Sequence, residues 1–586
     1  MFTKKTRNIY SLQSLTKTLC SFVLCVIFVD QGRGFKFSIL HNNDLHARYD
    51  PMKGSSEKCP KGDDEKGLCF GGFARVATVV EKARAAGPTL YLNAGDTYQG
   101  TPWYTFYKGE MAAEMMNMLN PDAMSLGNHE FDDNVDGLLP FLNLVKFPIV
   151  CCNLDLRKVP SMQNIKSLTK SIVIRKLEKA IGIIGYLTPE TKNLVTANDV
   201  EYFDEIDCIN SEAKKLVEQG VNIIIALGHS GYNRDQEIAK KCPEVDLVIG
   251  GHSHTFLYSG APPAKDMPEG NYPTIVINSD GRKVPVLQAY AYSKYLGEIH
   301  LEFDNGGNLI NFRGKPMLLD SSVPLDSSIK AVLDARRTKI DELDEQIVGI
   351  SKVFLNGSSC RKVECNFGNL ITDAMVYGRI AEDQGGLYFT DAAIAFANGG
   401  GIRASIDPGL EGIVTGADVP TVLPFGNTLS VTRIKGINII NLLEHSASVR
   451  NTSLAGGFLQ VSGLRITLNY NRPKGKRVTS VQVLCADCPS PHFEPLDKHK
   501  YYGVIVNTFI LNGGDGHKYF KDPNSYVSVM QMIDRENLAK YFQEHKVVYP
   551  MLEDRIKIVE KHRKSCASSL RTFLNIFIAL KIILTH

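Results

Sequence analysis

Short hydrophobic runs and amphipathic segments alternate along the first half of the chain. Residues 74–85 and 110–119 have the apolar spacing that is typical of helices. The runs that are typical of buried strands lie at 37–40, 89–92, 221–227 and 245–249. Because strands alternate with helices in this order, the sequence predicts an α/β domain.

A helical pattern separates this first half from the rest of the chain. It opens at Pro324 with aspartate and serine residues suited to an N-cap, and its apolar positions continue to about Leu343. From Ile347 to about Val559 the pattern changes to mixed helices and strands with several glycine-rich loops. We expect a first domain over 35–323, a linking helix over 324–346 and a second domain over 347–560.

The N-terminal residues 1–34 have the pattern of a secretory signal peptide. Basic residues precede an apolar run from Leu19 to Val29, and small residues follow from Gly32 to Gly34. The run is too short for a comfortable membrane span. The sequence therefore predicts export and a mature chain that begins near Phe35, whereas the alternative is a buried first helix.

Residues 565–586 combine small residues, a brief polar spacer and a terminal apolar tail, which is the pattern of a glycosylphosphatidylinositol (GPI) attachment signal. Ser565 is the preferred attachment site and Ser568 is the second choice. The spacer is short, and Lys581 interrupts the apolar tail. We expect a GPI anchor at the cell surface, with simple secretion as the alternative.

The thirteen cysteines agree with export, because disulfides persist in oxidising compartments. Cys208 and Cys242 could form one pair, with Cys151 and Cys152 as core residues. Three close pairs are expected to form disulfides: Cys59 with Cys69, Cys360 with Cys365, and Cys485 with Cys488. Glycosylation sequons begin at Asn356 and Asn451 and point the same way.

The charge balance excludes one class of partner. The chain has 66 basic and 63 acidic residues, a formal net charge of +3. Proteins that bind a nucleic acid polymer through its phosphates usually have a larger or more clustered basic excess. The sequence therefore argues against a nucleic acid polymer as partner.

Clusters of polar residues follow the hydrophobic runs of the first domain. They are His41-Asn-Asn-Asp44-Leu-His46, Asn93-Ala-Gly-Asp96, Gly127-Asn128-His129-Glu130-Phe131-Asp132, Gly228-His229-Ser230 and Gly250-Gly251-His252-Ser253-His254. Open α/β sheets bind ligands at the carboxyl ends of their strands. Carboxylate and amide oxygens together with imidazole nitrogens suit divalent cations. One such cluster is more often structural, but five in succession predict a centre for two cations.

These clusters resemble the calcineurin-like metallophosphatase superfamily, whose pattern is DxH, GD, GNHE, GH and GHxH. Across nearly the whole mature chain the sequence also resembles the 5'-nucleotidase family. Its matching segments in the second half are Asn398-Gly-Gly-Gly-Ile-Arg403, Leu423-Pro-Phe-Gly426 and Asn512-Gly-Gly-Asp-Gly516. The resemblance implies an N-terminal metallophosphatase αββα sandwich, a linking helix and a C-terminal α/β nucleotide-binding domain.

The resemblance also implies roles at the metal centre, with zinc as the expected ion. The implied ligands are Asp44, His46 and His254 for one ion, Asn128, His229 and His252 for the other, and Asp96 as the bridge. Such a pair activates a water and clamps phosphate oxygens. His129 would then stabilise developing charge or protonate the leaving oxygen, oriented by Asp132. The alternative is that His129 only forms hydrogen bonds around the site.

Phosphate chemistry alone does not select a nucleotide, so specificity must come from the second domain. The candidates are Arg361 and Arg403 for bidentate phosphate recognition, Phe425 and Phe509 for stacking on a base, and Asp515 for the ribose hydroxyls. Taken alone, such phenylalanines are more often core residues and such arginines surface charges. The family resemblance implies the binding roles and adds Asn398 on the base.

We therefore expect an extracellular 5'-nucleotidase that hydrolyses nucleoside 5'-monophosphates, AMP first, to nucleoside and phosphate. One alternative is an apyrase of the same family, which would remove phosphates from ATP and ADP. Another is a non-catalytic nucleotide-binding scaffold, although every expected ligand position is filled. The resemblance further implies a homodimer that forms through the C-terminal domain.

Overall fold

The computed structural model describes residues 34–54, 56–176, 179–195, 198–382, 389–452, 455–520 and 526–560. These residues form two compact units. The first unit runs to Val348 and includes Arg403–Asp407 and Val414–Phe425 from the second half of the chain. The second unit contains Gly349–Ile402, Pro408–Ile413 and the residues from Gly426 on. The GPI signal and, apart from Gly34, the signal peptide lie outside the described residues.

The first unit is built on two β-sheets. The described strands of the larger sheet are, in spatial order, β17 (Leu309–Leu318), β16 (Tyr295–Phe303), β1 (Phe35–Asn42), β4 (Thr89–Asn93), β5 (Ala123–Ser125), β6 (Ile149–Val150) and β8 (Leu168–Thr169). From β1 to β8 neighbouring strands run parallel. Register is set at Ile39, which lies opposite Leu90 of β4 and Ile299 of β16.

The second sheet has its parallel strands in the middle. Its described strands are, in spatial order, β14 (Thr274–Ile277), β15 (Lys283–Leu287), β13 (Leu247–Ile249), β12 (Ile223–His229), β10 (Lys179–Leu187) and β9 (Ser171–Lys176). One buried core joins the two sheets: Ile39 and Leu90 of the larger sheet cluster with Ile183 and Ile225 of the second. Burial on both faces explains why these strands are nearly continuous hydrophobic runs.

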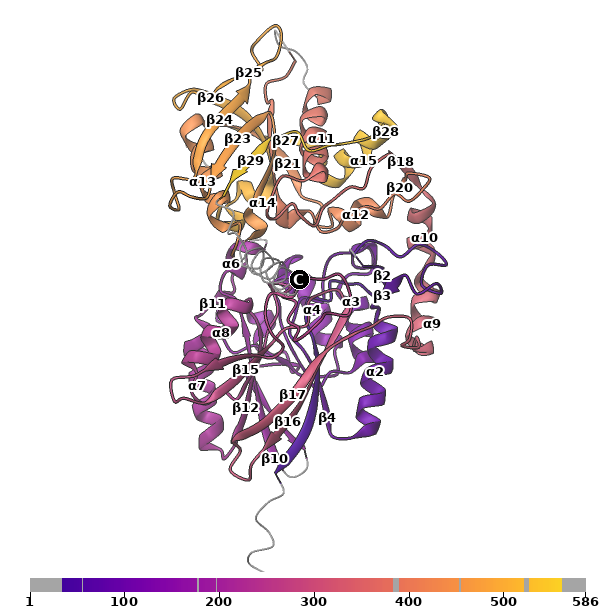
Figure 1. Cartoon of the computed structure of the whole chain (residues 1–586), viewed down its shortest axis with the longest axis vertical. Coiled ribbons are helices and arrows are strands. Elements are labelled where there is room, and N and C mark those ends of the chain that lie inside the picture. The colour runs from indigo at the N-terminus through magenta and orange to yellow at the C-terminus, as the bar shows by residue number, and fades with distance from the viewer. Residues whose placement is uncertain are drawn as a thin grey trace, which may run out of the picture. The chain divides into compact units, whose positions relative to one another are not determined.

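Helices cover the outer faces of both sheets. On the larger sheet these are α2 (Phe73–Ala86), α3 (Pro102–Leu119) and α4 (Asn134–Leu144); on the second sheet they are α7 (Glu205–Glu218) and α8 (Tyr232–Lys241). Figure 1 shows α2 on one side of the paired sheets and α7 and α8 on the other. The predicted αββα sandwich is therefore confirmed. The shorter elements of the unit are β2 (Met52–Lys53), β3 (Cys69–Phe70), β7 (Leu154–Asp155), β11 (Glu201–Tyr202), η1 (His129–Phe131), α5 (Pro160–Gln163) and α6 (Thr191–Leu194).

The linking segment forms two helices, where the sequence predicts one. α9 (Ser327–Arg336) begins after Asp326, whose carboxylate accepts hydrogen bonds from the first N–H groups of the helix. α10 (Thr338–Glu345) follows at once. Between them the N–H of Arg337 bonds to the carbonyl of Asp334, three residues back, so the chain tightens into a 3₁₀ turn. Apolar spacing does not reveal so short a break.

The three predicted close disulfides, Cys59–Cys69, Cys360–Cys365 and Cys485–Cys488, are confirmed. The predicted pairing of Cys208 with Cys242 is wrong, because Cys208 is bonded to Cys152. Successive residues after β6 face opposite layers: Cys151 lies in the core beneath α2 to α4, whereas Cys152 faces α7, which carries Cys208. Cys151 and Cys242 are buried free thiols.

The second unit is built mainly on two sheets, beside a smaller described sheet of β20 (Ile413–Thr415), β18 (Ile347–Ser351) and β28 (Val547–Val548). The larger has, in spatial order, β22 (Leu459–Ser462), β19 (Ile394–Asn398), β26 (Tyr501–Asn507), β21 (Thr428–Lys435) and β27 (Val527–Ile533) among the described residues. The other has β25 (Phe493–Pro495), β24 (Val478–Leu484), β23 (Leu464–Asn469) and β29 (Ile556–Val559). α13 (Gly436–Val449) packs Ile439, Leu442 and Leu443 into the core that both sheets share.

The remaining described elements of the second half complete the fold. They are α11 (Asn366–Glu382), η2 (Gly399–Gly401), α12 (Asp418–Val422), η3 (Ala455–Gly457), α14 (Thr508–Leu511), η4 (Gly514–Gly516) and α15 (Asp534–His545). α11 packs on both α15 and β22. The glycine-rich loops of the second domain therefore begin at the ends of β19 and α14.

Candidate metal centre and nucleotide site

Five loops of the first unit carry the polar clusters found in the sequence, and they follow β1, β4, β5, β12 and β13. Backbone hydrogen bonds join the first two loops, since Asp44 N–H donates to the carbonyl of Gly95 and His46 N–H to that of Asp96. The predicted ligands with left-handed backbone, φ between +49° and +76°, are Asp44, His46, Asp96, His252 and His254. Such strain in non-glycine residues is held only where the surrounding structure enforces it, and it concentrates at functional sites.

Asp96 lies at the centre of the cluster. Its Oδ2 is 2.9 Å from Nε2 of His229, 3.8 Å from Nε2 of His46 and 4.0 Å from Nε2 of His129. Its Oδ1 accepts a hydrogen bond from the backbone N–H of His129 (2.9 Å). One oxygen thus faces residues of both predicted ligand sets, which is the geometry that a bridging carboxylate needs.

The remaining predicted ligands form two groups around Asp96. In the first, Asp44 Oδ1 lies 3.2 Å from Nε2 of His254, and the Nε2 atoms of His254 and His46 are 3.1 Å apart. In the second, Nδ1 of His252 is 2.9 Å from Oδ1 of Asn128. The donor atoms of Asp44, His46 and His254 lie within 4.8 Å of one another, as do those of Asp96, His229 and His252. Each group can therefore surround one cation.

Backbone carbonyls orient two of the predicted imidazole ligands. Nδ1 of His46 donates to the carbonyl of Tyr98 (3.0 Å), and Nδ1 of His229 donates to that of Ala94 (2.7 Å). Nε2 is therefore the nitrogen that faces the cluster, and in the neutral imidazole it carries the lone pair. Metal-binding histidines are commonly oriented in this way.

Charge and space at the cluster fit a pair of cations. Burial lowers the pKa of His252 to about 3, so this imidazole is neutral at physiological pH. Burial also acts to lower the pKa of His229, but the carboxylates of Asp96 and Asp44 raise it to about 10. The site therefore favours positive charge. It also needs glycine at one point, since a Cβ on Gly127 would lie 2.2 Å from Oδ1 of Asp96.

Glu130 is a functional residue that the sequence reasoning missed, although it lies within the motif that was singled out. Its side chain is fully buried. Oε2 accepts hydrogen bonds from the N–H groups of Asp96 (3.0 Å) and Gly127 (2.6 Å). Oε1 accepts from the N–H and hydroxyl of Thr97 (2.6 and 2.7 Å) and more weakly from the N–H of Tyr98 (3.3 Å). One carboxylate thus joins the loop after β4 to the loop after β5.

His129 and Asp132 form a hydrogen-bonded pair on η1. His129 Nδ1 lies 2.7 Å from Oδ2 of Asp132, so Nε2 is the nitrogen that faces Asp96. Burial acts to lower the pKa of His129, but the neighbouring carboxylates of Asp132 and Asp96 raise it above its ordinary value. The aromatic ring of Phe425 stacks on the imidazole, with centroids 5.6 Å apart. The pair can therefore hold a proton next to the cluster.

Arg403, a predicted phosphate-binding residue, also lies at this cluster. It belongs to a segment of the second half that packs with the first unit. Its Nη2 is 2.9 Å from Nε2 of His46, and its guanidinium lies 5.9 Å from the centroid of the Phe425 ring. A buried guanidinium at this position is suited to an anion that approaches the predicted metal ligands.

Phe425 also belongs to the first unit, whereas the remaining predicted substrate residues belong to the second unit. Asn398, at the end of β19, donates from Nδ2 to Oδ2 of Asp515 (2.8 Å). Asn507 donates in turn to Oδ1 of Asn398 (3.2 Å), and its own Oδ1 caps α14 by accepting from Ile510 N–H. Phe509, on α14, packs at the edge of the buried core. Three of the predicted side chains thus lie on neighbouring elements, with Asn398 and Asp515 in direct contact.

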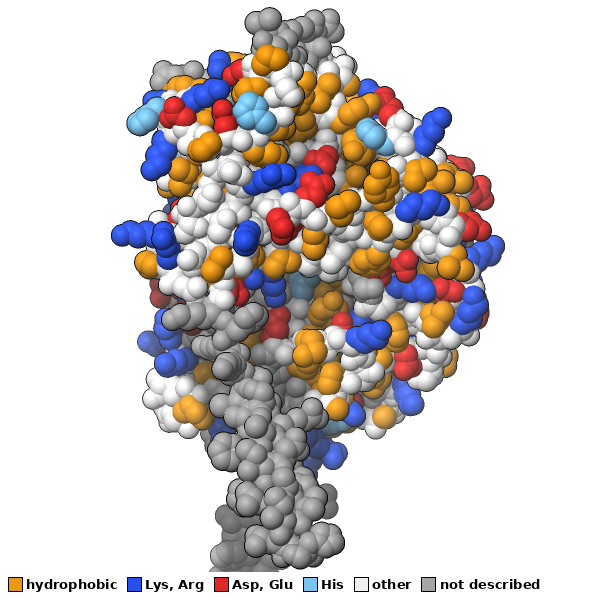
Figure 2. All heavy atoms as spheres, turned by 45° about the horizontal axis from the view of Figure 1, so that its top comes forward, with side chains coloured by type: hydrophobic (Ala, Val, Ile, Leu, Met, Phe, Trp, Pro, Cys, Tyr) orange, Lys and Arg blue, Asp and Glu red, His pale blue; other side chains and the backbone are white. Residues whose placement is uncertain are grey.

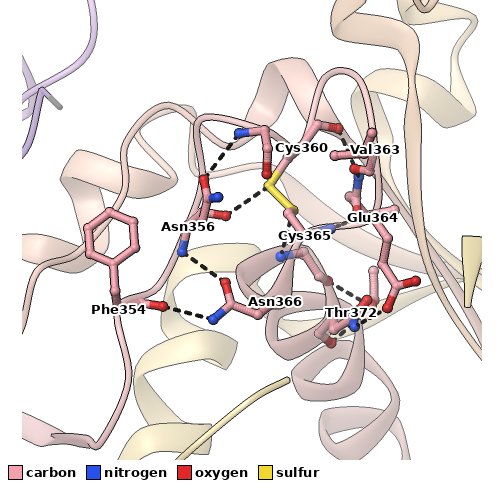
Figure 3. Close-up of a disulfide and its surroundings, with 12 residues drawn as sticks. Phe354, Asn356, Cys360, Val363, Glu364, Cys365, Asn366 and Thr372 are labelled. Atoms are coloured by element: carbon pink, nitrogen blue, oxygen red, sulfur yellow. Dashed lines mark hydrogen bonds between the residues drawn. A yellow bond between two sulfur atoms is a disulfide. The ribbon is translucent and has the colours of Figure 1, made fainter. Parts of the chain in front are cut away.

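Arg361 lies in the short loop that the Cys360–Cys365 disulfide closes. Figure 3 shows this disulfide and its surroundings. Gln460 of β22 holds this loop from within, because its Nε2 donates to the carbonyls of Cys360 and Val363 and its Oε1 accepts from Cys365 N–H. The loop that carries Arg361 is therefore held by a disulfide and by three hydrogen bonds to one side chain.

Two family models match the chain. Residues 37–256 match the calcineurin-like phosphoesterase family, and residues 347–522 match the C-terminal domain of 5'-nucleotidase. The 5'-nucleotidase of Homo sapiens is 42% identical over 529 residues, which cover 89% of this chain and 91% of the human protein. The chain belongs to the 5'-nucleotidase family. Protein 5NUC of Lutzomyia longipalpis is 45% identical over 539 residues, covering 91% of this chain and 94% of that relative.

A solved structure of the family has the same fold. The 5'-nucleotidase precursor from Thermus thermophilus is 36% identical and superposes with a TM-score of 0.82, covering 90% of this chain and 100% of that one. The chain is thus a 5'-nucleotidase family member with a metallophosphatase domain and a 5'-nucleotidase C-terminal domain. The site residues described above lie in these two domains.

Proposed function

We propose that this 5'-nucleotidase family member hydrolyses nucleoside 5'-monophosphates, AMP first, to a nucleoside and phosphate. The observation that carries the proposal is the convergence of two sets of predicted ligands on Asp96, with His129 and Asp132 beside them. The arrangement needs no residue from outside the family pattern. Membership of the family supports the choice of a nucleotide over other phosphate esters.

The centre would hold two divalent cations, with zinc as the expected metal. Asp44, His46 and His254 would bind one ion, Asn128, His229 and His252 the other, and Asp96 both. When bound, the ions would supply Lewis-acid activation of a water and neutralise charge on the phosphate oxygens. Hard oxygens and imidazole nitrogens in this proportion suit zinc.

His129 would act on the leaving side of the reaction. Asp132 holds Nδ1, so the N–H at Nε2 would donate to the ester oxygen or to the charge that develops on the phosphoryl group. The carboxylates of Asp132 and Asp96 raise the pKa of His129 above its ordinary value, which supports this role because a raised pKa favours the protonated imidazole. Stacking by Phe425 keeps the ring in one plane.

The substrate residues would divide the nucleotide between them. Arg361 and Arg403 would bind the phosphate, Asn398 and the rings of Phe425 and Phe509 the base, and Asp515 the ribose hydroxyls. The disulfide-closed loop supports the role of Arg361, and the contact between Asn398 and Asp515 supports a shared nucleoside site.

We further propose that the mature protein acts outside the cell. The predicted signal peptide, the GPI signal with Ser565 as attachment site, and the sequons at Asn356 and Asn451 support this location, with secretion as the alternative. None of the helices in the described part of the chain is both long and apolar enough to cross a membrane. Release from cells by a phosphatidylinositol-specific lipase would support the anchor, and retention would count against it.

We also propose a homodimer that forms through the C-terminal domain. Among the described strands of its sheet β27 is at the edge, and Tyr526, Val527 and Val529 are each more than half exposed there. Figure 2 shows hydrophobic side chains gathered in patches between charged ones. Val529→Lys should shift the protein from dimer to monomer in size-exclusion chromatography with light scattering. An unchanged mass would argue against this surface.

Phosphate release from AMP, ADP, ATP and p-nitrophenyl phosphate tests the function, measured with and without chelator and with zinc restored. Turnover of AMP that is lost with chelator and returns with zinc is expected. Turnover of ATP and ADP in place of AMP would favour the apyrase alternative. Chelator-insensitive turnover would contradict the proposed centre.

A further inference from the structure

Asp515 has an unusual backbone for a residue expected to bind substrate. It lies in η4 with φ of 53° and ψ of 19°, the left-handed region, and its side chain is nine-tenths buried. A non-glycine residue holds this conformation only when its neighbours constrain it. The contact with Asn398 fixes the carboxylate, but it does not fix the backbone.

His445 provides this constraint. It projects from α13, and its Nε2 lies 2.7 Å from the backbone carbonyl oxygen of Asp515. The carbonyl can only accept, so Nε2 carries the proton and donates. The imidazole also packs on the next residue: a Cβ on Gly516, whose φ is +79°, would lie 2.9 Å from Cε1 of His445. The ring therefore restrains the peptide that carries Asp515 from one side.

His517 restrains the same turn from the other side. Its Nε2 donates to the carbonyl of Gly457 in η3 (2.9 Å), and its ring meets His445 edge-on with centroids 4.8 Å apart. η3 in turn packs against Asp515, because a Cβ on Gly457 would lie 3.2 Å from both Cβ and the carbonyl oxygen of that residue. Two imidazoles thus tie the turn to α13 and to η3.

We propose that His445 is a positioning residue for nucleoside recognition, which holds the Asp515 carboxylate where it can bind the ribose hydroxyls. α13 is anchored in the core of the second unit, so His445 connects the turn to a rigid element. The proposal rests on the role given above to Asp515. It goes beyond that role because a residue 70 positions earlier in the chain would determine how tightly Asp515 binds the ribose hydroxyls.

The variants separate the hydrogen bond from packing. His445→Leu replaces the imidazole by an apolar side chain of similar size, which cannot donate a hydrogen bond to Asp515. His445→Gln places an amide N–H at a similar reach. His499→Leu changes an exposed histidine of the same unit and serves as the control. Should the leucine variant fail to fold, His445→Asn, whose amide is too short to reach Asp515, takes its place.

Each purified protein is assayed with AMP, with 2',3'-dideoxy-AMP, which lacks both hydroxyls, and with p-nitrophenyl phosphate, which lacks the nucleoside. We expect His445→Leu to raise KM for AMP about tenfold, the size of one weakened hydrogen bond to a charged group, with kcat nearly unchanged. The kcat/KM values for dideoxy-AMP and p-nitrophenyl phosphate should stay the same. His445→Gln and His499→Leu should behave as the unmodified protein.

Two outcomes overturn the inference. In one, His445→Leu keeps the normal ratio of kcat/KM between AMP and dideoxy-AMP, or the unmodified protein itself does not prefer AMP to dideoxy-AMP. In the other, all three substrates suffer equally, which is the mark of a general structural defect. Failure of the unmodified protein to hydrolyse AMP at all would instead refute the proposed function, so the two failures are distinguishable.

Discussion

Replacing Glu130 by glutamine tests whether the metal centre depends on a buried carboxylate that binds no metal. The change keeps the size of the side chain and exchanges one acceptor oxygen for an NH₂ group. If that group replaces Oε2, the N–H groups of Asp96 and Gly127 lose their acceptor. If it replaces Oε1, the N–H groups of Thr97 and Tyr98 lose theirs.

Either orientation of the glutamine therefore leaves two buried donors unsatisfied. Each costs about 1–3 kcal/mol, so Glu130→Gln should lower the free energy of unfolding by about 2–6 kcal/mol. Domains of ordinary stability, about 5–15 kcal/mol, can remain folded after such a loss. Because both loops that carry Asp96 and Asn128 are loosened, the affinity for zinc should fall as well.

Urea unfolding of the metal-free protein measures the first effect, and calorimetric titration with zinc measures the second. The matched control is Glu81→Gln, an exposed position on α2, which should change the unfolding free energy by less than about 0.5 kcal/mol. If Glu130→Gln unfolds at the same urea concentration as the unmodified protein and binds zinc with unchanged affinity, the anchoring role of Glu130 is wrong.

Three further predictions follow from the described contacts. His129→Gln should lower kcat for AMP by about 10²–10⁴-fold but affect p-nitrophenyl phosphate less, since that leaving group needs no proton; an equal loss on both would argue against proton donation. Cys360→Ser should cost about 2 kcal/mol of stability in thermal unfolding and raise KM for AMP, whereas Cys485→Ser should leave KM unchanged. Burial lowers the pKa of His41 to about 3, so its contribution to stability is present above pH 6.5 and is lost on acidification, by about 2 kcal/mol between pH 7 and pH 5. The difference between the unfolding curves of the unmodified protein and His41→Gln should show this slope, and parallel curves would contradict it.

The hydrophobic pattern predicts the architecture of the first domain well because its strands are buried on both faces. The run at 37–40 lies in β1, and the run at 221–227 lies in β12 except for its first two residues; Ile39 and Ile225 occupy the core between the sheets. The polar clusters stand out in the sequence for the same reason, since they interrupt the hydrophobic pattern directly after a strand. The structure brings the predicted ligands together, whereas their roles remain predictions.

What the sequence does not reveal depends on contacts between distant segments. Cys152 pairs with Cys208 because of the face it presents after β6, which spacing between cysteines cannot show. Glu130 follows His129 in the motif, yet the backbone N–H groups that converge on it come from two loops. His445 has no local pattern that connects it with Asp515. Such residues can be recognised only from coordinates.

The left-handed backbone at Asp44, His46, Asp96, His252 and His254 has a practical consequence for anyone who evolves this protein in the laboratory. Glycine tolerates these torsion angles at lower energetic cost than the native side chains do. A library selected only for thermal resistance in the presence of chelator would therefore enrich such replacements and discard the catalyst. Every round of such a selection should therefore also test the variants for catalytic turnover.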